Sequence, residues 1–388
     1  MNDFIRKITP NIRLLSMVLV LILLWTYFRL QVGEFYFSGE SIAKLSRDMA
    51  TWAILAAGMT MVIVSGNIDL SVGSLLALVA ATGALLINPD YGFGLSATVA
   101  VPIALLVGTL LGTMQGLLTA YFRIPSFIVT LGGLFIFRGI TQKVSAFDPR
   151  VPDSSWIVSI GFDYLSASTG WILGVLCAVV LILIIVRNRS KKKDAGLPID
   201  TILLTSIKIS VVLFLIGGFI FKVNEYKGIP NQTVVMAVVL AALYVISQNT
   251  KFGRHLYAIG GNPEAARFSG IKVEQKTVGA FALMGLLTGI AGVVWMAQNQ
   301  GSTKNAGEFY ELYAIAAAVI GGTSLMGGRG TIFGTFLGGL VMATVIQGMD
   351  YTNLENWIQL VVRGAVLVIA VGIDIATKNP PAWIRRLR

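Results

Sequence analysis

The chain has 388 residues, of which 55% are hydrophobic and only 13% are charged. Soluble domains average about 25% charged residues, so the composition excludes an ordinary soluble enzyme or binding module. The formal net charge of +11 does not indicate a nucleic-acid partner, because the basic residues are distributed by membrane side, as described below. One histidine and one cysteine argue against a His/Cys zinc site, a Ser-His-Asp triad and an internal disulfide.

Apolar runs of about 17–25 residues, each able to cross about 30 Å of hydrocarbon, recur along the sequence. They predict an all-α polytopic membrane protein with about twelve (ten to twelve) transmembrane helices in a single transmembrane domain over 1–388. The alternating ten-residue segments typical of a β-barrel are absent. The first run lacks a small-residue cleavage site, so we expect it to be retained. The expected spans are 14–30, 49–66, 70–87, 97–120, 127–142, 169–186, 203–221, 231–248, 277–297, 308–326, 331–349 and 357–376.

The positive charges predict the orientation of these spans. Most of the 30 lysines and arginines fall at the two ends of the chain, in the basic loop 187–200 and in the polar segment 251–276. Cytoplasmic loops carry the excess of Lys and Arg, so both termini and these two loops are expected in the cytoplasm. The basic loop is interpreted as a membrane anchor, with a specific docking or lipid site as the alternative.

Two polar, glycine-bearing segments interrupt the apolar pattern, SGNIDLSVGS at 65–74 and GGTSLMGGRG at 321–330. Interruptions in corresponding halves often mark discontinuous helices beside a substrate path, and we expect two interrupted helices here. Asp69 is a carboxylate in apolar surroundings, which favours a functional role, although capping of the next helix is the simpler reading. The candidate residues for a translocation path or gate are Asn67, Asp69, Ser71, Ser126, Thr130, Arg138, Thr323 and Ser324.

Glycines recur every fourth residue at Gly108, Gly112 and Gly116, at Gly285 and Gly289, and at Gly330, Gly334 and Gly338. Such small-residue faces let helix backbones approach closely. Packing inside the chain is the ordinary interpretation, and a homodimer contact is the alternative.

The polar segment 251–276 contains a short helix with both ends marked. Asn262 is a good N-cap, Pro263 suits the first helical position, and Gly270 suits the left-handed residue past the end. A helix of about two turns is unstable alone in water, so a cytoplasmic partner protein is expected to contact it.

The sequence contains no P-loop, no GxSxG elbow and no HExxH motif. We therefore expect a non-catalytic chain that holds no cofactor and no metal.

Four segments, in order, resemble the permeases of bacterial ABC sugar importers of the ribose, galactose and xylose group. They are GNIDLSVGS (66–74), RIPSFIVTLGGLFIFRG (123–139), YAIGGNPEAARFSGI (257–271) and VIGGTSLMGGRGTIFGTFLG (319–338). Together the resemblance covers roughly residue 40 to the end. An added pair of spans around a basic loop, at 169–230, makes the xylose permeases the most similar members. A departure from the family pattern is Gly66-Asn67 before IDLSVGS.

The resemblance implies a cytoplasmic coupling loop that contacts an ATPase subunit with paired nucleotide-binding domains, which would hold the ATP and magnesium. The residues implied for this contact are Gly260, Gly261, Asn262, Glu264, Ala265, Ala266, Arg267, Ser269 and Gly270. It also implies a soluble sugar-binding protein outside, docking on loops such as 31–48, 143–168 and 298–307, and a permease homodimer in the bacterial inner membrane.

The expected function is thus ATP-driven import of a monosaccharide. D-xylose is the expected solute, and ribose, galactose or another small solute are the alternatives. An amino-acid or furanone permease of the same superfamily stays open. An ion-coupled secondary transporter would need acids inside the membrane, and only Asp69 and Asp374 are expected there. A membrane-embedded enzyme lacks an acid–base pair or a metal set.

Overall fold

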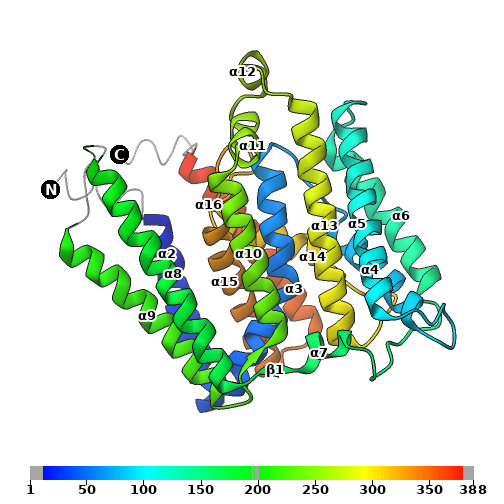
Figure 1. Cartoon of the computed structure of the whole chain (residues 1–388), viewed down its shortest axis with the longest axis horizontal. Helices are drawn as coiled ribbons and strands as arrows, with labels where there is room; N and C mark the ends of the chain where they lie inside the picture. Colours follow the sequence, from blue (N-terminus) through cyan, green and yellow to red (C-terminus); the bar gives the residue numbers. More distant parts are fainter. Residues whose placement is uncertain (1–11, 195, 197–200, 379–388) are drawn as a thin grey trace.

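The computed structural model describes residues 12–194, 196 and 201–378, and this part of the chain is almost entirely helical (Figure 1). In chain order the elements are α2 (Ile12–Val32), η1 (Glu34–Phe37), α3 (Gly39–Val64), α4 (Val72–Ile87), α5 (Ala97–Ala120), α6 (Ser126–Val144), α7 (Ile157–Phe162), β1 (Tyr164–Leu165), α8 (Ala167–Asp194), α9 (Ile202–Asn224), β2 (Ile229–Pro230), α10 (Asn231–Asn249), α11 (Lys251–Gly261), α12 (Pro263–Phe268), α13 (Val273–Asn299), α14 (Tyr310–Ile320), α15 (Ile332–Tyr351) and α16 (Asn356–Lys378). The strands β1 and β2 form one short antiparallel pair. The predicted all-α fold is confirmed.

Eight helices of the described residues are long and apolar enough to cross a membrane, namely α3, α5, α6, α8, α9, α10, α13 and α15. The other four predicted spans fall on shorter apolar helices in α2, α4, α14 and α16. With 11 residues, α14 is about 16 Å long, half the hydrocarbon thickness. The predicted span 308–326 is therefore too long, because α14 ends at Ile320 where a glycine-rich turn begins.

The start of α3 also differs from the prediction. The Ser38 side chain accepts a hydrogen bond from the backbone N–H of Ser41 at 3.2 Å, which caps the helix ten residues before the predicted start at 49. The expected loop 31–48 is replaced by η1 and the first turns of α3.

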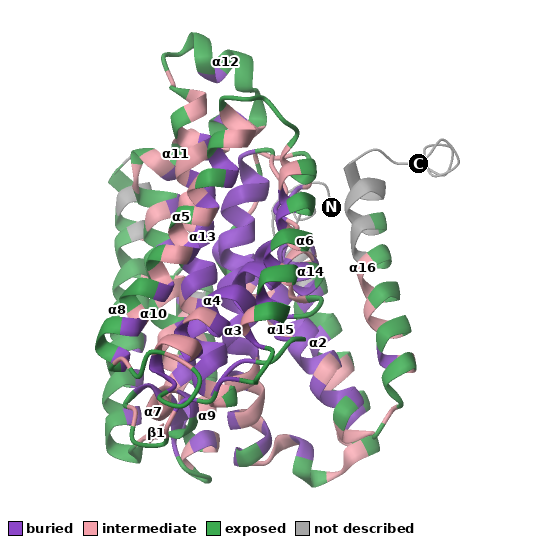
Figure 2. Cartoon of the chain, turned by 90° about the vertical axis from the view of Figure 1, so that its right-hand side faces the viewer, coloured by how far each residue is buried: buried purple, intermediate pink, exposed green. Residues whose placement is uncertain are grey.

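The centre of the bundle is α3. In the most apolar stretch of α3, 89% of the residues are buried inside the protein. In the corresponding stretch of α9, only 6% of the residues are buried. Helices α10, α13, α14 and α15 pack around α3, and Figure 2 shows the buried residues concentrated on these inner helices. At the left edge of Figure 1, α8 and α9 form a hairpin whose attachment to the bundle is mainly through α9.

The glycine faces pack inside the chain, as the ordinary interpretation predicts. A Cβ at Gly112 would lie 2.5 Å from the carbonyl oxygen of Phe281, and one at Gly285 would lie 2.3 Å from that of Gly108. These contacts bring the backbones of α5 and α13 together, because no side chain separates them. The same holds between α14 and α15, where a Cβ at Gly338 would lie 2.1 Å from the carbonyl oxygen of Ala317.

The two polar breaks have different shapes. Residues 65–71 form a non-helical connection from α3 to α4, and Gly66 has a φ of 84°. The second break is a turn, 321–331, after which α15 packs back against α14. We name it the glycine turn. The prediction of two interrupted helices is corrected here, since the second break joins two neighbouring helices that run back along each other.

Candidate functional site

The capped helix expected at 262–269 is present as α12, at one extremity of the molecule (Figure 1). The Asn262 side-chain oxygen accepts the backbone N–H of Ala265 at 2.9 Å, and Pro263 occupies the first helical turn. Beyond the C-cap, Gly270 has a φ of 81°, which glycine adopts at little cost. We call this extremity the loop end.

Most of the residues expected in the coupling contact are accessible at the loop end. The exposed ones are Gly261, Asn262, Glu264, Ala265, Arg267, Ser269 and Gly270. In contrast, Ala266 is only 4% exposed and packs within the loop. Arg267 pairs with Glu274 of the same chain.

Sequence reasoning missed Phe268, which is 91% exposed at the end of α12. A large apolar side chain in an otherwise polar, solvent-facing helix was the available signal, because exposed aromatic residues are enriched where proteins contact partners.

Gly260 lies where three segments cross. A Cβ at this position would lie 1.8 Å from the carbonyl oxygen of Val64 and 2.6 Å from the backbone nitrogen of Gly328. The Val64 oxygen in turn accepts the N–H of Gly328 at 2.9 Å, and the Tyr257 hydroxyl donates to the carbonyl oxygen of Gly330 at 2.9 Å. Burial raises the pKa of Tyr257, so this hydroxyl stays protonated at neutral pH. Thus α11 contacts both the end of α3 and the glycine turn.

The structure brings together most of the predicted path residues, around the connection 65–71. The backbone N–H of Ile68 donates to the Ser126 hydroxyl at 3.2 Å, and the Thr130 hydroxyl donates to the Ile68 carbonyl oxygen at 3.3 Å. One Asp69 carboxylate oxygen accepts the N–H of Ser71 at 2.8 Å and its hydroxyl at 2.7 Å. Asp69 thus forms a local turn onto Ser71, which occupies the N-cap position of α4 without a side-chain capping bond.

Asn67, within the same connection, donates to the Ser65 hydroxyl at 3.1 Å. The other three predicted path residues have separate surroundings. Arg138 donates to the carbonyl oxygen of Ala306 at 2.6 Å. Thr323 and Ser324 are buried in the glycine turn. These contacts are internal to the fold.

A cavity of about 730 Å³ opens at the extremity opposite α12, among α3, α13, α14, α15 and α16. We call it the bundle cavity. None of the predicted path residues lines it. The cavity wall is made by Leu45, Arg47, Asp48, Met49, Trp52, Gln298, Glu308, Phe309, Tyr310, Tyr313, Ala343, Ile346, Gln347, Asp350, Asn356, Leu360 and Arg363. The aromatic and amide groups of this wall come from α3, α13, α15, α16 and the segment at the start of α14, so no single stretch of the sequence reveals them.

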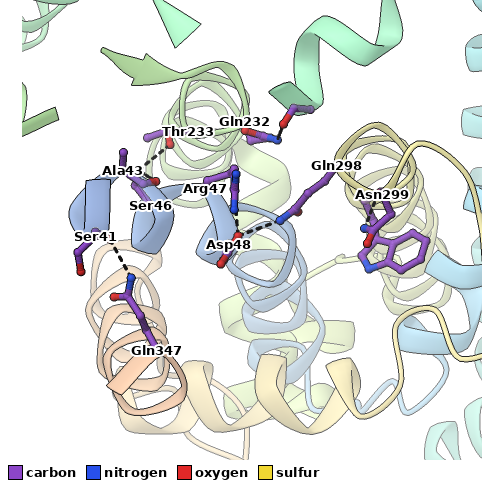
Figure 3. Close-up of polar contacts among 12 residues, drawn as sticks. Ser41, Ala43, Ser46, Arg47, Asp48, Gln232, Thr233, Gln298, Asn299 and Gln347 are labelled. Atoms are coloured by element: carbon purple, nitrogen blue, oxygen red, sulfur yellow. Dashed lines mark hydrogen bonds and ion pairs between the residues drawn. The ribbon is translucent and has the colours of Figure 1, made fainter. Parts of the chain in front are cut away.

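The polar groups of the wall hold one another in place. The Asp48 carboxylate accepts from Gln298 at 2.8 Å and from Arg47 at 3.1 Å (Figure 3). On the other side, Arg363 donates to the Tyr313 hydroxyl at 2.7 Å. The Trp52 indole N–H donates to the backbone carbonyl oxygen of Asp48 at 2.6 Å, which fixes the ring beside the carboxylate.

Acids within apolar helices are more numerous than the sequence analysis expected. Asp48 lies in α3 and Glu311 in the first turn of α14, whereas Asp69 lies in the non-helical connection 65–71. The side chain of Asp374 lies outside the described residues. Glu311 stands in a largely apolar segment, so hydropathy alone does not single it out.

The short helix α14 lies between the bundle cavity and the glycine turn. At the start of α14, Tyr310 and Tyr313 line the bundle cavity. Directly after its last residue comes the glycine turn, where a Cβ at Gly327 would lie 2.8 Å from the carbonyl oxygen of Gly260. Backbone contacts thus connect α11, through the glycine turn, to the helix that borders the cavity.

Comparison with known proteins agrees with this architecture. Residues 41–371 match the family described as the branched-chain amino acid transport system / permease component. The xylose transport system permease protein of Escherichia coli (strain K12) is 37% identical over 95% of this chain and 93% of its own length. That of Haemophilus influenzae (strain ATCC 51907 / DSM 11121 / KW20 / Rd) is 36% identical over 95% and 98%.

A ribose import permease protein of Escherichia coli (strain K12) is 31% identical over 87% of each chain. No solved structure matches. The match covers most of the sequence and includes both polar breaks, α11 and α12. The chain therefore belongs to this family of transport-system permease components and is a multi-pass membrane protein.

Proposed function

We propose that this chain is the membrane-spanning permease of an ATP-driven importer that moves a monosaccharide into the bacterial cytoplasm. The proposed monosaccharide is D-xylose. The observation that carries the proposal is the connection through α14. Its first turn borders the bundle cavity, and the turn after it lies against Gly260 of α11.

The loop end is the contact for the ATPase in this proposal. The docking surface is made by the exposed residues of α12, which include Phe268. This surface is connected to α3 and the glycine turn through Gly260 and Tyr257 of α11. Movement of the ATPase would displace α11 and α12 together. The result would be a change in the packing of α14, which alternates access to the cavity.

The orientation in the inner membrane follows from the charges. The loop end carries Arg254, Arg267 and Lys272, and α2 begins and α16 ends at the same extremity (Figure 1). Basic loops face the cytoplasm, so both termini are proposed to be cytoplasmic. The bundle cavity then faces the exterior, where a sugar-binding protein would deliver the solute to a permease homodimer.

The choice of D-xylose rests on the two xylose permease relatives, whose identity exceeds that of the ribose relative. The hairpin α8–α9 occupies the added segment expected at 169–230. The ATP and magnesium would be held by the partner ATPase.

The test is reconstitution of the permease in proteoliposomes with its ATPase and binding-protein partners. We expect uptake of labelled D-xylose that requires ATP and all three components, with weaker competition by ribose and galactose. Uptake driven by a proton or sodium gradient alone would overturn the ATP-driven assignment. Exclusive uptake of leucine would overturn the sugar assignment.

A further inference from the structure

We infer that the bundle cavity is a low-affinity binding site for one uncharged, polyhydroxylated solute, in which Asp48 and Trp52 contact the sugar. This inference rests on the proposed function and adds the substrate-contacting residues, which the sequence resemblance does not assign.

The size of the cavity fits a small solute with water around it. Ligand sites commonly measure about 300–1,000 Å³, and the bundle cavity measures about 730 Å³. A monosaccharide would occupy only part of this volume. Partial filling gives weak binding, which suits a permease that must release its solute to the other side.

One wall offers an aromatic surface beside a carboxylate. The rings of Trp52 and Tyr313 lie with their centroids 6.1 Å apart and their planes inclined by 59°. Aromatic rings combine a large apolar area with a fixed geometry, and they pack against the C–H face of a sugar ring. The Asp48 carboxylate lies next to Trp52 and has two oxygens, which accept several hydrogen bonds from hydroxyl groups.

The charges of the wall favour a neutral ligand. Asp48 is already paired with Arg47 and bonded to Gln298. Arg363 is held by the hydroxyl of Tyr313 and by the side-chain oxygen of Gln359. The charge of Asp48 is compensated by Arg47, and the guanidinium of Arg363 already donates to two neutral acceptors. A free carboxylate or ammonium group would therefore compete with existing contacts of the wall.

The remaining acids of the wall strengthen this preference against anions. Glu308 and Asp350 line the cavity, so its five formally charged residues are two arginines and three acids, with a sum of −1. Phosphorylated sugars and other anions are therefore disfavoured. The carboxylate of a branched-chain amino acid would likewise meet a wall with a negative sum of charges, in which Arg47 is already paired with Asp48.

The experiment measures D-xylose binding and transport with the same purified permease–ATPase complex. Trp52 is one of 7 tryptophans, and D-xylose is expected to quench part of the tryptophan fluorescence, with half-maximal quenching in the millimolar range and no quenching by L-leucine or xylose phosphate. Trp52→Phe should remove the signal. Asp48→Asn should weaken binding about tenfold, since a hydrogen bond to a charged group contributes about 1.5–3 kcal/mol.

The matched control is Asp90→Asn, which makes the same change in an exposed residue outside the cavity wall and should leave binding and uptake unchanged. Co-purification of the ATPase with the Asp48→Asn permease in the same amount as with the wild type shows that the complex is assembled. Import of D-xylose by the wild type without any quenching, together with wild-type import by Asp48→Asn, would overturn the cavity inference alone. Failure of the wild type to import D-xylose would overturn the proposed substrate.

Discussion

Gly260 and Val64 are in contact through their backbones, and a Cβ at position 260 would lie 1.8 Å from the Val64 carbonyl oxygen. This contact joins the loop end to the last residue of α3, the most buried helix of the bundle. A side chain at 260 must therefore separate α11 from α3.

The first prediction follows from this contact. Gly260→Ala should lower substrate-stimulated ATP hydrolysis and sugar uptake by about tenfold or more, because overpacking of a close contact costs about 1–3 kcal/mol. Gly261→Ala is the matched control, since a Cβ at Gly261 meets no atom within 4 Å. Equal uptake by the two variants, at equal amounts in the membrane, would show that the Gly260 contact does not transmit the movement.

The second prediction concerns Phe268, which is 91% exposed. Phe268→Ser should weaken association with the ATPase by about 2 kcal/mol, the loss typical of a central aromatic residue in an interface, while leaving the thermal stability of the isolated permease unchanged. The measurement is co-purification with the ATPase over a range of concentrations. Phe147→Ser changes another exposed phenylalanine, away from the loop end, and should not affect this association.

Much of this fold was readable from the sequence because its signals are local. Asn262, Pro263 and Gly270 mark the ends of α12 within nine residues, and the structure has these ends as predicted. Apolar runs likewise located the twelve apolar helices. The lengths of α3 and α14 were less predictable, since a cap at Ser38 and a turn at Gly321 decide them.

The bundle cavity was not predictable by the same means. Asp48, Gln298 and Arg363 are far apart in the sequence, and only the packing of α3, α13 and α16 brings them to one wall. The predicted path residues were chosen for their place in polar breaks, where local hydrogen bonding to the backbone explains them. Asp69 and Thr130 illustrate this, as both bond within the connection 65–71 or to it.

The third prediction tests the orientation. Cys177 is the only cysteine, so Cys177→Ser gives a chain without thiols. In that background, Ser269→Cys should react with a membrane-impermeant maleimide only from the cytoplasmic side, and Asp90→Cys only from the outside. Both positions are exposed. The reverse pattern in right-side-out and inverted vesicles would contradict the proposed topology and the role of α12.

The fourth prediction separates two roles for Asp69. Its carboxylate oxygen accepts the backbone N–H and the hydroxyl of Ser71, which makes it a structural turn residue before α4. Asp69→Asn keeps an acceptor oxygen there and should retain close to wild-type uptake. Asp69→Ala loses it and should lower the free energy of unfolding by about 1–3 kcal/mol, because the buried polar groups of Ser71 lose their acceptor. Thermal unfolding in detergent measures the second effect. If Asp69 bound the sugar or a coupled cation through its charge, Asp69→Asn would abolish uptake even though the protein remained as stable as the wild type.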